Sequence, residues 1–115
     1  INSNVTPRLI GNLILTISND GYFYIIDKNK GNIIRITNLY NHYKEKKRKN
    51  INPVGFVIGK NNLYLTNSDG KIIIVGISLG NTVKIEKISS DFISEPFIFN
   101  KNLYVVRNGS IIKYD

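Results

Sequence analysis

The 115-residue sequence contains no Cys, Met or Trp, and it also contains no Ala. Without Cys, disulfides, thiolate metal ligands and thiol nucleophiles are excluded within these residues. No apolar run is long enough to cross a bilayer as a helix, and no charged-then-apolar leader is present. Helix formers other than Leu and Lys are scarce, whereas the strand-favouring residues Ile, Val, Tyr and Phe supply most of the apolar side chains. The composition therefore predicts an all-β chain.

A turn–strand–turn unit recurs along the chain. Residues 19–31 read NDGYFYIIDKNKG, residues 68–80 read SDGKIIIVGISLG, and residues 108–115 read NGSIIKYD. In each copy the position six residues after the turn glycine (Gly21, Gly70, Gly109) marks the end of the apolar run, and its occupants are Asp27, Gly76 and Asp115. Because such internal periodicity is the signature of repeat architectures, we interpret the chain as a repeat protein.

The repeat has the length of a four-stranded unit. Leu13, Leu63 and Leu103 are separated by steps of 50 and 40 residues, and a basic insertion accounts for the longer step. Alternating apolar and polar residues, as at Val83 to Glu86, predict strands joined by tight turns. The expected strands are 7–10, 13–18, 22–27, 32–37, 53–58, 62–66, 71–77, 82–88, 97–99, 102–106 and 110–114. We expect a single domain, 1–115, with repeats at about 7–39 and 53–89 and a truncated repeat at about 95–115.

The turn residues are expected to have structural roles. Asp20 and Gly21 predict a two-residue primed turn, because Asp-Gly adopts positive φ at low cost. A carboxylate at Asp27 can accept hydrogen bonds from the backbone of the next turn, and Gly76 shows that the position tolerates loss of the carboxylate. The residues assigned to turn and repeat geometry are Asp20, Gly21, Asp27, Gly31, Asp69, Gly70, Gly80, Gly109 and Asp115.

This pattern of turn, Asp-Gly, strand, Asp, turn and Gly resembles the quinoprotein-type (PQQ-like) β-propeller repeat, and its three copies cover most of the chain. The resemblance implies antiparallel four-stranded blades, two complete and one truncated. Enzymes of this family hold pyrroloquinoline quinone and a metal ion on the propeller axis, and their blades usually end in a docking Trp. Because Trp is absent, we expect a non-catalytic chain without a cofactor; the alternative is a fragment of a PQQ-dependent quinoprotein dehydrogenase.

Within that family the chain most resembles the C-terminal part of the BamB lipoproteins. The resemblance implies a scaffold for protein–protein interaction in outer-membrane β-barrel assembly, on the periplasmic face of the outer membrane of a Gram-negative bacterium. The implied partners are the assembly machinery or an unfolded β-barrel substrate, and the membrane is expected to be reached only through an anchor outside this chain.

Residues 44–49, KEKKRK, carry five positive charges and one negative charge, which is half of the net charge of +8. A block of like charge repels itself, so we expect an extended, solvated loop over residues 40–50. The alternative is an anion-binding loop, in which Tyr40 and Tyr43 stack on bases and the cations contact nucleic acid or anionic headgroups. The cations concerned are Lys44, Lys46, Lys47, Arg48 and Lys49.

Catalytic and metal sites are not indicated by the residue pattern. His42 is the only histidine and has no second histidine with which to share a metal ion. Two blades and part of a third do not close a ring, so the outer faces of the end blades are expected to be apolar. We therefore expect either a piece of a larger propeller or a chain that covers these faces by self-association. The start at Ile1 in place of Met is interpreted as a processed or excised piece.

Overall fold

The computed structural model describes residues 2–114, which form eleven strands and one short helix. Every strand pair is antiparallel and the strands form three sheets, so the predicted all-β class is confirmed. The described residues divide into two compact units, residues 2–53 and residues 54–114.

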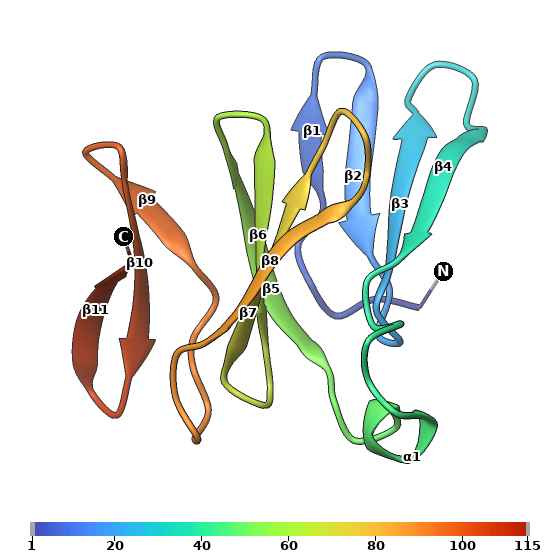
Figure 1. Cartoon of the computed structure of the whole chain (residues 1–115). Helices are drawn as coiled ribbons and strands as arrows, with labels where there is room; N and C mark the ends of the chain where they lie inside the picture. Colours follow the sequence, from blue (N-terminus) through green and yellow to red (C-terminus); the bar gives the residue numbers. More distant parts are fainter. Residues whose placement is uncertain (1, 115) are drawn as a thin grey trace. The chain divides into compact units, whose positions relative to one another are not determined.

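The first unit contains a four-stranded sheet in the order β1-β2-β3-β4, coloured blue to cyan in Figure 1. Its buried face is made by cross-strand pairs of apolar residues: Leu15 lies opposite Ile25, and Ile17 lies opposite Phe23. Such pairs are the unit of sheet stabilisation. The strands are β1 (Arg8–Ile10), β2 (Leu13–Ile17), β3 (Tyr22–Asp27) and β4 (Ile33–Asn38).

The second unit contains a four-stranded sheet, β5-β6-β7-β8, and a three-stranded sheet, β9-β10-β11 (Figure 1). The predicted two complete sheets and one truncated sheet are therefore confirmed, and β11 lies at the edge where the other two sheets have a fourth strand. The strands are β5 (Pro53–Gly59), β6 (Asn62–Asn67), β7 (Lys71–Gly76), β8 (Thr82–Lys87), β9 (Phe97–Phe99), β10 (Asn102–Arg107) and β11 (Ser110–Tyr114).

The core of the second unit is centred on β7. Ile72, Ile73, Ile74 and Val75 are consecutive and all buried, which requires that both faces of this strand be covered. The sequence predicted this, because the run is apolar at every position. By contrast β8, the outer strand, is exposed or half-buried along its whole length.

The prediction of a two-residue primed turn at Asp20-Gly21 is wrong. Four residues, 18–21, connect β2 to β3. Gly21 has a φ of 87°, and its amide donates a hydrogen bond to the Ser18 carbonyl at 3.0 Å. The Ser18 hydroxyl stabilises this wider turn, since it donates to Asp20 and accepts from the Tyr22 amide at 3.1 Å. Two-residue loops with positive φ at both residues occur instead at Lys60-Asn61, Asn100-Lys101 and Asn108-Gly109.

Both four-stranded sheets contain a β-bulge at the same repeat position. The pairing register shifts between Ile25 and Ile26 in the first sheet and between Ile74 and Val75 in the second. Consequently Val83 is inserted between the paired residues Thr82 and Lys84 of β8, and the simple alternation predicted from Val83 to Glu86 is interrupted. A bulge increases strand twist, so the two sheets are twisted at equivalent points.

Candidate binding surfaces

The basic segment, residues 44–49, lies between β4 and β5 in the first unit. Its centre is a single helical turn, α1 (Glu45–Arg48), in which the amides of Lys47 and Arg48 donate to the Lys44 carbonyl at 3.0 and 2.9 Å. The segment is therefore not the extended loop expected from its charge. Lys44, Lys46, Lys47 and Lys49 are exposed.

Two buried tyrosines lie immediately before this segment in the chain and anchor its N-terminal end. Tyr40 and Tyr43 pack edge to face with their ring centroids 5.3 Å apart, and the Tyr43 amide donates to the Tyr40 carbonyl at 3.0 Å. Tyr40 lies over Gly21, where an added Cβ would be 2.3 Å from the ring. Because both rings are buried, they are not available to stack on nucleic-acid bases, and that part of the anion-binding alternative is wrong.

Arg48 has a structural contact that distinguishes it from the neighbouring lysines. Its Nε and Nη2 atoms donate to the Tyr43 carbonyl at 3.3 and 3.1 Å, and the side chain is half-buried. His42 is exposed and lies against the Tyr43 ring, with centroids 4.0 Å apart. The cations that face solvent are thus the four lysines, held on a turn that Arg48 and the two tyrosines stabilise.

Two of the aspartates assigned to turns, Asp27 and Asp69, accept hydrogen bonds from backbone amides. Asp27 Oδ1 accepts from the amides of Asn29 and Lys30 at 2.9 and 3.1 Å. Asp69 Oδ1 accepts from the Lys71 amide at 3.2 Å. The glycines assigned to turns, Gly21, Gly31, Gly70, Gly80 and Gly109, all have positive φ. Asp115, which is the equivalent of Asp27 in the third repeat, lies outside the described residues.

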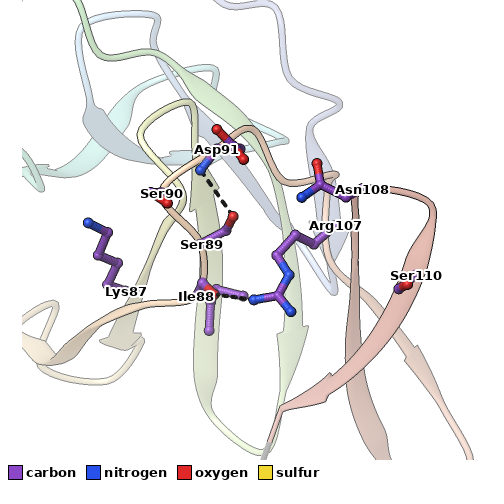
Figure 2. Close-up of a pocket in the computed structure, with 8 residues that line it drawn as sticks. All are labelled: Lys87, Ile88, Ser89, Ser90, Asp91, Arg107, Asn108 and Ser110. Carbon is purple, nitrogen blue, oxygen red and sulfur yellow. Dashed lines mark hydrogen bonds between the residues drawn. The ribbon is translucent and has the colours of Figure 1, made fainter.

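A shallow polar hollow of about 480 Å³ lies between residues 87–91 and the β10–β11 turn (Figure 2). Arg107 Nη1 donates to the Ile88 carbonyl across it at 3.2 Å, and the Asp91 amide donates to Ser89 Oγ at 3.0 Å. Arg107 thereby joins the two sheets of the second unit. Asn108 and Ser110 complete its wall.

A second, more apolar hollow of about 650 Å³ lies between the β5–β6 and β9–β10 turns of the same unit. Lys60 and Lys101 lie on these two turns, and Ile98 and Leu103 are among the apolar residues of its wall. This site was not predicted from the sequence. The available signal was a lysine in the same turn of two successive repeats, 41 residues apart.

Tyr114 also lines this second hollow, and its buried hydroxyl lies near the Glu86 carboxylate. Burial raises the pKa of the Tyr114 phenol well above its usual range, and the nearby Glu86 carboxylate raises it further. Both effects disfavour the phenolate. The hydroxyl therefore stays protonated to higher pH than that of an exposed tyrosine.

Two sheets expose apolar side chains on one face. In the three-stranded sheet, Phe99 is 62% and Ile111 is 67% exposed, and Phe97 stacks on Tyr104 with centroids 5.5 Å apart. The strand register places these four side chains on one side of the sheet. In the first sheet, the exposed Leu9 and Ile33 belong to one cross-strand row.

Residues 2–114 contain neither a candidate metal site nor a candidate membrane-spanning helix. No group of three His, Asp or Glu side chains in this range is placed to hold a metal ion. No helix in the same range has the length and apolarity needed to cross a membrane.

Comparison with solved structures shows the fold to be of the β-propeller type. The chain is similar to BamB from Moraxella catarrhalis (TM-score 0.66, 14% identity over 94% of this chain and 30% of that one). It is similar to the WD40 propeller domain of Doa1 (TM-score 0.72, 14% identity, 94% and 34% covered). A quinohemoprotein alcohol dehydrogenase from Pseudomonas putida HK5 is also similar (TM-score 0.69, 17% identity, 88% and 16% covered).

The chain thus spans about a third or less of each of these three proteins. No protein-family model and no curated protein sequence matches it. At these identities the likeness establishes the fold alone.

Proposed function

We propose that this chain is a non-catalytic part of a β-propeller that acts as a scaffold for protein–protein interaction. The observation that carries the proposal is the apolar face of the three-stranded sheet, where Phe97, Phe99, Tyr104 and Ile111 lie together beside the sheet edge at β11. Exposed apolar side chains grouped on one face are typical of a protein-binding surface. An edge strand can also recruit an extended segment by main-chain hydrogen bonding.

The finer proposal is a BamB-like role in outer-membrane β-barrel assembly, at the periplasmic face of the outer membrane. It is supported by the PQQ-like repeat pattern, with repeats at about 7–39, 53–89 and 95–115 of one domain, and by the fold likeness to BamB. The partners are the assembly machinery or an unfolded β-barrel substrate, whose alternating apolar strands match an apolar face next to a strand edge.

A binding measurement tests this role. A fluorescently labelled, unfolded outer-membrane β-barrel protein is diluted from urea into solutions of the chain, and its anisotropy is followed. Replacing Phe99 and Ile111 by Ser should weaken binding about tenfold, because two large apolar contacts are lost. Leu79→Ser is the matched control, since Leu79 is 82% exposed in a separate turn. If the double variant at Phe99 and Ile111 binds no more weakly than Leu79→Ser, or if the parent chain does not bind, the proposal is rejected.

The four exposed lysines of the basic segment support a second candidate function, which is binding to an anionic surface or to nucleic acid. Replacing Lys44, Lys46, Lys47 and Lys49 by Ser should abolish salt-sensitive binding to duplex DNA or anionic vesicles. A variant in which Lys28, Lys30, Lys84 and Lys87 are replaced has the same net charge and should keep that binding. If both variants behave alike, the segment has no specific role. The likeness to the dehydrogenase concerns fold alone and supports no enzymatic proposal.

A further inference from the structure

The apolar hollow between the β5–β6 and β9–β10 turns has the size of a ligand site. Its volume of about 650 Å³ lies within the range of roughly 300–1,000 Å³ found for small-molecule pockets. It is bordered by turns from two different sheets of the second unit.

Two lysines give the hollow a positive charge. Lys60 and Lys101 each belong to a two-residue turn and have φ of 48° and 65°, a conformation that Asn or Gly adopts more readily than Lys. Both side chains are exposed and border the hollow. None of the described lining residues is Asp or Glu, and the Glu86 carboxylate lies beside one of them, Tyr114. An anion bound here would interact favourably with both ammonium groups and reduce their mutual repulsion.

The rest of the wall is apolar. Ile58, Ile98 and Leu103 line it, and Ile98 stays 40% exposed although it also contacts the backbone near Gly59. The rings of Tyr64 and Tyr114 lie in the same wall. A ligand with an apolar body would therefore remove Ile98 and the two rings from water, which is favourable in proportion to the apolar area covered.

We propose that this hollow binds a small amphipathic carboxylate, with its anionic group between Lys60 and Lys101 and its apolar body against Ile98, Leu103 and Tyr64. Neither feature alone defines the ligand. The lysines select a negative charge, and the wall selects an aromatic or branched aliphatic body of modest size. This site is independent of the apolar face proposed to bind proteins, because Phe99 and Ile111 do not line it.

The test uses 4-phenylbutanoate and its uncharged analogue 4-phenyl-1-butanol as probes. Each is titrated into isotope-labelled chain while backbone amide resonances are followed by NMR. The acid should shift the amides of Gly59, Ile98 and Leu103, and the alcohol should bind about fivefold or more weakly, as expected for loss of charge pairing near a surface.

Charge variants decide the assignment. Lys60→Gln and Lys101→Gln should each weaken acid binding about fivefold and leave binding of the alcohol unchanged. Lys28→Gln is the matched control, because it removes an exposed lysine from the first unit and should have no effect. Ile98→Ala should weaken both probes, since it removes an apolar wall contact that the acid and the alcohol share. Ile98 is 40% exposed, so the substitution leaves no buried cavity of the size of a core deletion. Equal binding of acid and alcohol, or shifts confined to residues 44–49, would overturn the proposal.

Discussion

At the scale of single residues, the turn glycines share a backbone conformation but differ in their surroundings. Gly21 and Gly31 have φ of 87° and 73°. A Cβ at Gly21 would be 2.3 Å from the Tyr40 ring, whereas a Cβ at Gly31 would meet nothing within 4 Å. Gly21 is thus required both for its φ and for the packing of Tyr40, and Gly31 for its φ alone.

Alanine substitutions separate these two requirements. Gly21→Ala should lower the free energy of unfolding by about 3 kcal/mol, because a strained φ is combined with overpacking against a buried ring. Gly31→Ala should cost about 1 kcal/mol from the φ strain only. Urea denaturation of both variants measures the difference. Equal losses would show that Tyr40 moves aside without cost.

Tyr114 predicts a pH dependence of stability. Burial, followed by the Glu86 carboxylate, raises the pKa of its phenol in the folded chain. The folded state therefore retains this proton when the unfolded state releases it, so the associated stability is complete below pH ~10 and is lost as the pH rises above that value. Tyr114→Phe should lose less stability than the parent chain between pH 9 and pH 11 in urea denaturation. Parallel losses in both proteins would contradict this prediction.

At the scale of elements, the strands were predictable because the relevant physics is local. Alternation and the flanking turn residues located β3, β9 and β11 with both ends correct, and the other strands to within one residue at each end. The bulges were not predictable, because they depend on the register between two strands. The same holds for the β2–β3 turn, where the Ser18 side chain stabilises a wider loop than Asp20-Gly21 indicated.

The candidate sites were less predictable than the strands, because they depend on contacts between distant residues. The charge of residues 44–49 was visible in the sequence, but the burial of Tyr40 was not, since it depends on the missing side chain of Gly21. The hollow lined by Lys60 and Lys101 forms only when two successive sheets are placed together. Periodicity predicts the sheets and not the space between them.

The basic segment depends on Arg48 more than on any lysine. The Arg48 contacts to the Tyr43 carbonyl close the helical turn, so Arg48→Gln should accelerate amide hydrogen exchange at Lys47, Arg48 and Ile51 about tenfold. Lys46→Gln, an exposed neighbour, should leave exchange unchanged. If the two variants exchange alike, the guanidinium does not hold the segment.

At the scale of the whole molecule, the balance between apolar and charged surface determines association. Phe99 and Ile111 share an exposed face of the three-stranded sheet, and repeat units of this kind bury such faces against neighbouring units. The net charge of +8 opposes association by repulsion between copies. Raising the salt concentration screens that repulsion without weakening apolar contacts.

We therefore expect the chain to self-associate in solution, more strongly at high salt than at low salt. Phe99→Lys together with Ile111→Lys should reduce the mass measured by light scattering, because the apolar face is lost and like charge is added. Leu79→Lys, paired with Val83→Lys at a second exposed position of the β7–β8 hairpin, adds the same charge outside that face and should have a smaller effect. A monomeric parent chain at every salt concentration would contradict the prediction, and equal effects of the two variants would assign association to net charge instead.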